Sequence, residues 1–248
     1  MLALDLDLTP TEMAELEAVD PGAWFTGVGF RNASTPRHPH SAVLEENNTF
    51  KQAQVADWLA RVVPGRRVLD TFCANGAFSF RAAELGASSV VGVDFEQKRI
   101  DAANLVAHIA RDHGIDWDID FSQLDMYEVG RRFQEPFDVV LCLGGLYHVA
   151  DPAYILSQLR PLTAQWLVVQ TSNVLPLPGR IGRFKVRQDL TGEGLSSVRG
   201  GHGAWSFTAA CFREMLRHAG FEVVDERRPK LTKALRFPWY SALARPLP

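Results

Sequence analysis

Cysteine and long apolar stretches are scarce in this sequence. Its three cysteines, Cys73, Cys142 and Cys211, have no CxxC spacing and cannot all pair, which favours a reduced cytoplasmic protein over a disulfide-bonded secreted one. The longest nearly uncharged stretch, residues 139–155, contains a histidine and an aspartate and is too short to span a bilayer. The first residues are acidic where a signal peptide is basic, so we expect neither a membrane anchor nor a secretory signal.

Charge is unevenly distributed along the chain of 248 residues, although the formal net charge is only −3. Residues 1–175 carry 23 acidic and 13 basic side chains, whereas residues 176–248 carry six acidic and 13 basic ones. Two solvated faces would explain this asymmetry. That is the simpler explanation, and a C-terminal part that contacts an anionic or polar acceptor is the alternative.

From Arg66 onward, apolar strand-like segments alternate with helical segments. The expected strands are Arg67–Phe72, Val90–Asp94, Trp117–Phe121, Phe137–Cys142 and Trp166–Gln170, and the expected helices between them are Ala77–Leu85, Glu96–His113 and Pro152–Leu159. This alternation predicts an α/β protein with a parallel sheet and helices on both faces. In such a sheet the ligand crevice lies at the carboxyl ends of the strands.

The two ends of the chain depart from this alternation. Before it we expect a helix at Thr11–Val19, a loop at Pro21–His40 and a helix that begins at Asn47, Asn48 or Thr49 and runs to about Val62. After it we expect a long irregular stretch to Gly203, a helix to His218, a strand at Phe221–Val224 and a last strand at Ala234–Leu243. We therefore divide the chain into residues 1–50, a helix and loop that form a lid or substrate segment, and residues 51–248, the main domain with an acceptor-site insert at 172–205.

Three acidic residues follow successive expected strands. Asp70 ends the first, and small residues then lead to Gly76 at the start of a helix, where unpaired N–H groups can meet a ligand. Asp94 ends the second strand, in the position that accepts hydrogen bonds from ribose hydroxyls. Asp125, followed by Met126, suits an adenine. The sequence has no GxGxxG or Gly-Lys-Ser/Thr string, so a positively charged nucleoside without phosphates fits this acidic site best.

In these motifs the chain resembles the class I S-adenosylmethionine-dependent methyltransferases, over roughly Val68 to Val224. The resemblance implies a Rossmann-like sheet and S-adenosylmethionine as cofactor. It also implies a set of cofactor contacts: Asp70, Phe72, Cys73, Ala74, Asn75, Gly76, Asp94, Phe95, Asp125, Met126, Leu143 and Gly144. No ligand spacing in the sequence supports a metal site.

The chain departs from the family in its glycine-rich loop. The usual D-x-G-x-G-x-G string reads Asp-Thr-Phe-Cys-Ala-Asn-Gly at residues 70–76, so only the last glycine is present. The motif D-x-F-C-x-x-G-x-F-S at residues 70–79 resembles that of RNA methyltransferases that modify pyrimidines. That chemistry needs a nucleophilic cysteine at the acceptor end, and none of the three cysteines is well placed for it.

The acceptor end carries the string Gly-Gly-Leu-Tyr-His at residues 144–148. It resembles two groups: tRNA wobble-uridine enzymes that transfer a carboxymethyl group, and small-molecule O-methyltransferases that include sugar enzymes. The acidic cofactor half disfavours tRNA. Our interpretation is therefore methyl transfer to a hydroxyl of a polar small molecule, most simply a sugar or oligosaccharide, without nucleic acid or membrane as partner.

A hydroxyl acceptor needs a nearby base, and His148 is the first candidate. Asp151 is placed to orient its ring, and His202 is the second candidate base. Tyr147, Trp205 and Trp24 are the expected substrate contacts, since flat aromatic faces suit sugar rings. A non-catalytic protein that binds S-adenosylmethionine stays an alternative, and the oligomeric state stays open, a homo-oligomer included.

Overall fold

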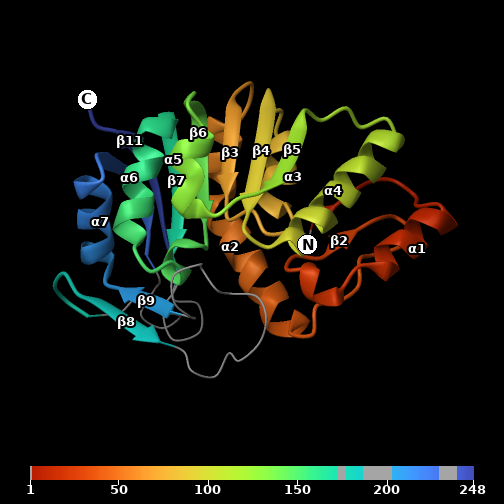
Figure 1. Ribbon diagram of the computed structural model, residues 1–248, viewed down its shortest axis with the longest axis horizontal. Coiled ribbons are helices and arrows are strands. Elements are labelled where there is room, and N and C mark those ends of the chain that lie inside the picture. The colour runs from red at the N-terminus through yellow and green to blue at the C-terminus, as the bar shows by residue number, and fades with distance from the viewer. Residues whose placement is uncertain (1, 172–176, 187–202, 229–238) are drawn as a thin grey trace. The chain divides into compact units, whose positions relative to one another are not determined.

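The computed structural model describes residues 2–171, 177–186, 203–228 and 239–248. It divides the chain into two compact units, Met1–Gln123 and Leu124–Pro248 (Figure 1). Each unit is described separately. The candidate base His202 and most of the expected insert at 172–205 lie outside the described residues.

The first unit is built on three parallel strands in the order β3-β4-β5, namely β3 (Arg67–Thr71), β4 (Ser89–Asp94) and β5 (Ile119–Gln123). Asp70 pairs with Gly92, which pairs in turn with Phe121 on β5. A Cβ atom at Gly92 would lie 2.5 Å from the ring of Phe121, so only glycine leaves room for this side chain. Three strands of the predicted parallel sheet are thereby confirmed, with β5 two residues later than expected.

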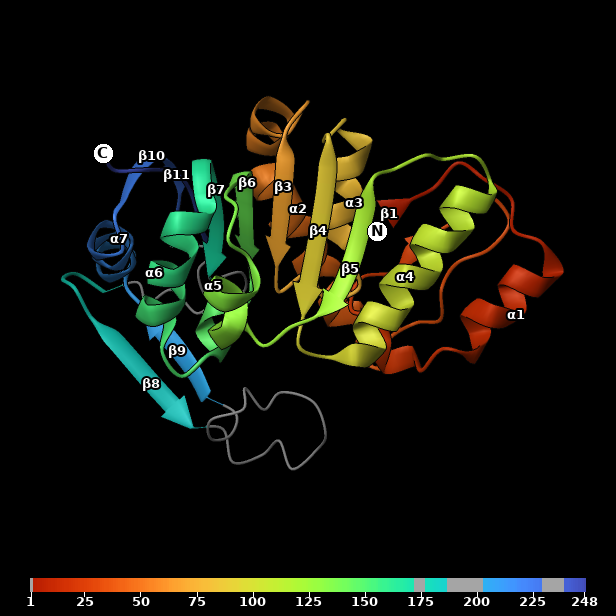
Figure 2. The same cartoon turned by 45° about the horizontal axis from the view of Figure 1, so that its top comes forward.

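Three helices of the first unit pack against these strands or continue into them: α2 (Ser41–Val62), α3 (Ala77–Glu84) and α4 (Gln97–Asp112). Figure 2 shows α2 and α3 behind β3 and β4. The apolar face expected for α2, which contains Val55, Trp58, Leu59 and Val62, is fully buried. The helix nevertheless begins at Ser41 rather than at Asn47–Thr49. Asn48 is not a cap, because its side chain is buried and bonded to the preceding segment of the chain.

The first 40 residues are more ordered than a helix and a loop. Helix α1 (Pro10–Ala18) begins at a capping box between Thr9 and Glu12, one residue before the expected start. A short parallel pair, β1 (Leu2–Ala3) with β2 (Val28–Gly29), and the 3₁₀ turn η1 (Pro21–Ala23) were not expected from the sequence. Leu2, Leu4, Leu6 and Leu8 alternate with exposed residues and are buried, so this segment belongs to the core of the first unit.

The larger sheet of the second unit has its described strands in the order β6-β7-β11-β10. They are β6 (Phe137–Leu143), β7 (Thr163–Thr171), β11 (Tyr240–Pro246) and β10 (Phe221–Arg227). The turn η2 (Met126–Glu128) and helix α5 (Val129–Arg132) precede β6, and the turn η3 (Leu146–His148) and helix α6 (Pro152–Leu162) connect β6 to β7. Strands β6 and β7 are parallel, as expected, but β11 is antiparallel to both β7 and β10. The sheet is therefore mixed, with parallel and antiparallel neighbours. Strand β11 lies at 240–246 instead of 234–243, and residues 229–238 are outside the described part.

A second correction concerns the expected irregular stretch before α7 (Ala209–His218). Its described parts include an antiparallel pair, β8 (Gly182–Val186) with β9 (Gly203–Phe207). The alternation of apolar and polar residues in Arg-Phe-Lys-Val and Ala-Trp-Ser-Phe is a strand pattern that the surrounding glycines obscured. Within the described residues, no helix has the length and apolarity needed to cross a bilayer.

Candidate functional site

Asp70 is a buried carboxyl of the first unit with a strongly raised pKa. It lies at the end of β3, is 1% exposed, and accepts a hydrogen bond of 2.6 Å from Ser79 Oγ on α3. Burial raises the pKa of this carboxyl to about 7, and the nearby Asp94 raises it further, while the bond from Ser79 and the charge of Lys51 act in the opposite direction. A buried acid in this position is stabilised by a cationic ligand, which fits the role predicted for it.

Lys51 is a buried cation that the sequence reasoning missed. It lies on α2, is 5% exposed, and its Nζ stands 5.6 Å from the ring centre of Phe25 and 5.8 Å from that of Phe78. Burial lowers the pKa of this ammonium to about 8, and the charge of Asp70 opposes the shift. A signal was available: Lys51 precedes Val55 by four residues and so lies on the apolar face of α2, in a chain with only five lysines.

The loop between β3 and α3 has the backbone conformation that glycine favours, with only one glycine in it. Phe72, Ala74 and Gly76 have φ values of 58°, 50° and 83°, all in the left-handed region. These are the positions at which the related motif carries glycine. Phe72 and Ala74 are therefore strained by about 1–3 kcal/mol each, and such strain persists where the surroundings hold the loop in place. The sequence predicted that residues 72–76, called the cofactor loop below, contact the cofactor. It could not predict that this loop keeps its backbone shape without two of the three glycines.

Asp94 supplies part of that support. Its Oδ2 accepts a hydrogen bond of 3.0 Å from the backbone N–H of Ala74, and its Oδ1 accepts one of 3.0 Å from the N–H of Glu96. Each carboxylate oxygen has capacity for a further donor, so hydroxyl groups can bind the same side chain. Phe95, half-buried, follows directly, and its carbonyl accepts a bond from Gln123 on β5.

Cys73 and Asn75 occupy the same loop with different surroundings. Cys73 is 6% exposed, and burial raises the pKa of its thiol well above the usual value, so this cysteine is a poor nucleophile at neutral pH. Asn75 is 1% exposed and its side chain is bonded to the backbone of Thr26. The side chain of Asn75 therefore contacts the N-terminal segment, which leaves its backbone for the predicted cofactor contact.

Four of the predicted cofactor contacts lie in the second unit, two before β6 and two at its end. Asp125 caps η2 by accepting a bond of 3.0 Å from the N–H of Tyr127, and Met126 is buried. Leu143 ends β6 and is buried, and Gly144 follows with φ 93°, its N–H bonded to the carbonyl of Gln170 at 3.0 Å. Gly144 is thus a position where the turn requires glycine.

The candidate acceptor residues of the second unit lie on η3 and just after it. The rings of Tyr147 and His148 are 4.0 Å apart, both residues are half-buried, and Tyr147 meets Trp239 edge-on at 6.0 Å. The structure does not support the orienting role expected for Asp151. Its Oδ1 accepts from the N–H of Tyr154 and so caps α6, and no bond joins its carboxylate to His148 among the described contacts.

Trp205 approaches the same loop from β9. Its indole N–H donates a bond of 3.2 Å to the carbonyl of Ala150, and its ring stacks on Phe207 at 5.5 Å and contacts Phe184 at 5.0 Å. Trp205 therefore supports the loop that carries Tyr147 and His148. Trp24 belongs to the first unit, is 1% exposed, and lines a pocket with Thr35, Pro36, Arg37 and His38.

Comparison with known proteins shows which fold this chain shares. Residues 63–183 match the family model described as a methyltransferase domain. The N-terminal domain of EvdMO1, crystallised with S-adenosylhomocysteine and D-fucose, has a TM-score of 0.60 and 19% identity, over 96% of this chain and 94% of that one. The structural likeness shows the fold of this chain, an α/β sheet of the class I methyltransferase type. The expected fold class is thereby confirmed.

Two curated relatives are O-methyltransferases by name. The ubiquinone biosynthesis O-methyltransferase of Hahella chejuensis is 35% identical over 97 residues, which is 38% of this chain and 37% of that protein. The 27-O-demethylrifamycin SV methyltransferase of Amycolatopsis mediterranei is 29% identical over 207 residues, 78% of this chain and 70% of that protein. The chain thus spans little more than a third of the first relative and about two thirds of the second.

Proposed function

We propose that this chain is an S-adenosylmethionine-dependent methyltransferase that methylates a hydroxyl group of a polar small molecule, most simply a sugar or oligosaccharide. The observation that carries the proposal is the first unit's loop at residues 72–76, which keeps the left-handed backbone of the related motif between the two buried acids Asp70 and Asp94. S-adenosylmethionine is the cofactor, and EvdMO1, a structural neighbour, was crystallised with its demethylated product.

The charges of the first unit match the amino-acid end of this cofactor, which carries an ammonium and a carboxylate. Asp70 would accept hydrogen bonds from the ammonium, and Lys51 would donate to the carboxylate. Each buried charge of the protein would then be paired with an opposite charge of the ligand, which offsets the cost of burial.

The remaining cofactor contacts are proposed from the resemblance. Asp94 would bind the ribose hydroxyls with the oxygen capacity left after its two backbone bonds. Phe95, Asp125 and Met126 would contact the adenine, and the backbone of Leu143 or Gly144 would offer a carbonyl. When bound, the cofactor supplies an activated methyl group on a sulfonium.

For the acceptor, the residues of η3 would position the hydroxyl and remove its proton. His148 would accept the proton of the acceptor hydroxyl at a ring nitrogen, and the cofactor would supply the methyl group. Tyr147 and Trp205 would contact the acceptor. The O-methyltransferase names of the two relatives support a hydroxyl acceptor. The D-fucose present with EvdMO1 supports a sugar.

The charges of the C-terminal part weigh against the tRNA alternative. Among its described residues, Arg213 pairs with Glu226 at 3.3 Å, Arg245 with Glu222 at 2.7 Å, and Arg180 with Glu214 at 3.5 Å. Arginines that are already paired with acids present less positive charge to phosphates. We therefore expect no salt-dependent binding of tRNA.

The test uses the whole chain with S-adenosylmethionine labelled in its methyl group and a panel of free sugars, oligosaccharides, phenols and tRNA. Label transfer to a sugar hydroxyl is the expected result. Transfer to a phenol alone would keep the methyltransferase and overturn the sugar. Tight binding of S-adenosylmethionine without transfer to any acceptor would favour the non-catalytic alternative.

A further inference from the structure

The side chain of Asn75 forms a two-bond ring with the backbone of Thr26, 49 residues earlier in the chain. Its Oδ1 accepts from the N–H of Thr26 at 2.9 Å, and its Nδ2 donates to the carbonyl of Thr26 at 2.7 Å. A side-chain amide in this arrangement replaces the peptide group of a neighbouring strand. Both residues are buried, Asn75 at 1% and Thr26 at 6% exposure, so the two bonds are shielded from water.

A second asparagine, Asn48, also binds this segment. Asn48 on α2 donates to the carbonyl of Phe25 at 2.9 Å and to Oγ1 of Thr26 at 3.1 Å. The following residues are also fixed, since Val28 and Thr35 exchange two hydrogen bonds. Residues 24–28 are therefore a docked segment rather than a free loop.

The docked segment is bonded to the cofactor loop next to a strained residue, Ala74. Asn75 lies between Ala74 and Gly76, both in the left-handed conformation. Asp94 holds the N–H of Ala74, and the backbone of Thr26 holds the side chain of the next residue. Strained residues persist only where several contacts determine their conformation, and the bonds of Asn75 are among those contacts.

The same segment also borders the buried cation. The ring of Phe25 lies 5.6 Å from Nζ of Lys51 and 5.4 Å from Cζ of Arg99. If residues 24–28 undocked, the loop would lose the bonds of Asn75. Lys51 would lose its contact with the ring of Phe25.

We propose that Asn75 is a positioning residue whose side chain latches residues 24–28 to the cofactor loop, so that docking of this segment and binding of S-adenosylmethionine stabilise each other. This inference rests on the proposed function for the identity of the ligand. It adds a coupling between the N-terminal segment and the loop, which is reciprocal by thermodynamic necessity. Asn75, Thr26 and Asn48 are called the latch below.

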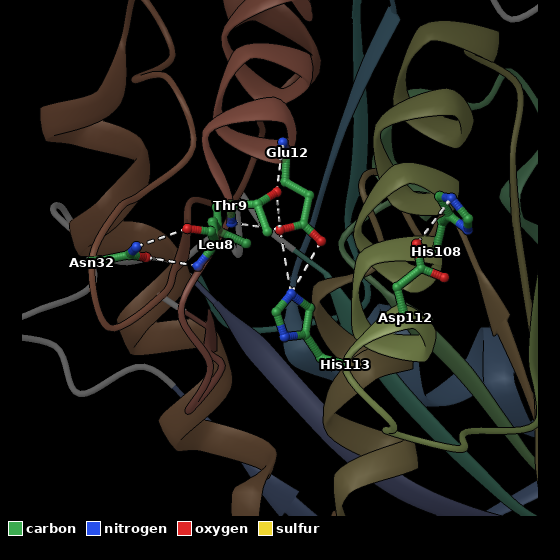
Figure 3. A network of polar contacts seen from close by, with 7 residues as sticks. All are labelled: Leu8, Thr9, Glu12, Asn32, His108, Asp112 and His113. Carbon is green, nitrogen blue, oxygen red and sulfur yellow. Dashed lines mark hydrogen bonds and ion pairs between the residues drawn. The ribbon is translucent and has the colours of Figure 1, made fainter.

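The chain contains a matched control for the latch. Asn32 makes the same two-bond ring with the backbone of Leu8, accepting from its N–H at 2.8 Å and donating to its carbonyl at 2.9 Å (Figure 3). Figure 3 also shows the neighbouring Thr9–Glu12–His113 contacts, none of which involves the cofactor loop. Asn32→Ala thus removes equivalent bonds within the N-terminal region without touching residues 72–76.

Calorimetric titration with S-adenosylhomocysteine compares the unmodified chain with Asn75→Ala and Asn32→Ala. We expect Asn75→Ala to weaken binding by about 5- to 150-fold and Asn32→Ala to leave it unchanged. Equal affinities of Asn75→Ala and the unmodified chain would overturn the latch alone. No binding by the unmodified chain would overturn the proposed function and the latch with it.

Hydrogen exchange of the unmodified chain decides the question even if Asn75→Ala does not fold. The amides of Thr26 and Leu8 are each bonded to an asparagine Oδ1, and only the first is in the latch. Saturating S-adenosylhomocysteine should slow exchange of the Thr26 amide by about 5- to 150-fold and leave that of Leu8 unchanged. Unchanged exchange at Thr26, or equal slowing at both amides, would contradict the proposal.

Discussion

Replacing Lys51 with methionine tests how the first unit recognises the amino-acid end of the cofactor. Methionine fills a similar volume beside Phe25 and Phe78, and Asp70, with its pKa already near 7, can take up a proton when the neighbouring charge is gone. The variant should therefore fold. It can no longer donate a hydrogen bond to a carboxylate.

A hydrogen bond to a charged group contributes about 1.5–3 kcal/mol, which corresponds to a loss of affinity of about 10- to 150-fold. Calorimetry should show this loss for S-adenosylhomocysteine. Decarboxylated S-adenosylmethionine lacks the group that Lys51 would bind, so its affinity should not fall. Lys98→Met is the matched control, because Lys98 lies on α4 of the same unit, is 42% exposed in its side chain and pairs with Asp20.

Two results would refute the reasoning. If Lys51→Met binds S-adenosylhomocysteine as tightly as the unmodified chain, Lys51 does not contact the ligand. If both ligands lose affinity equally, Lys51 acts on the shape of the site rather than on the carboxylate.

Three further predictions concern the loop, the buried acid and the candidate base. Ala74→Gly should raise the free energy of unfolding by about 1 kcal/mol in urea titrations, because glycine adopts φ 50° without strain. Ala56→Gly, in the exposed middle of α2, is the control and should lower it by about as much. A loss of stability in both variants would contradict the strain at Ala74. The contribution of protonated Asp70 to the free energy of unfolding is fully present below about pH 4 and is lost as the pH rises through about 7, so Asp70→Asn should remove this part of the pH profile, and an unchanged profile would place the pKa elsewhere. His148→Ala should lower turnover by roughly 10²–10⁴-fold with little change in cofactor affinity; near-normal turnover in this variant, with loss in His202→Ala, would assign the base to His202.

The sequence predicted the parts of this fold that follow from periodicity. Strands β3, β4, β6 and β7 are buried on both sides and read as apolar runs, and Asp70 and Asp94 stand at their ends because the chain must turn there. Strands β10 and β11 were expected in part, but their antiparallel direction depends on long-range pairing that no local pattern encodes.

The contacts that complete the site could not be read in this way. Lys51 is buried by tertiary packing against Phe25 and Phe78, although lysine is ordinarily exposed. The pairing of Asn75 with Thr26 joins residues 49 positions apart, and Asn48 resembled a helix cap because asparagine favours caps. For Asp151 the error was the opposite one. The sequence suggested a partner for His148, whereas in the structure Asp151 caps α6.

The central claim is that the acids and the loop of the first unit bind S-adenosylmethionine, and the most direct measurement is the affinity of the chain for S-adenosylhomocysteine before and after Asp94→Ala. We predict binding by the unmodified chain and a loss of about 1–3 kcal/mol in the variant, because the ribose loses its acceptor. Since Asp94 also holds the N–H of Ala74, Asp94→Asn serves as the second variant: it keeps an oxygen for that bond and should still bind more weakly than the unmodified chain. Binding that is absent in the unmodified chain, or unchanged in both variants, would contradict the account.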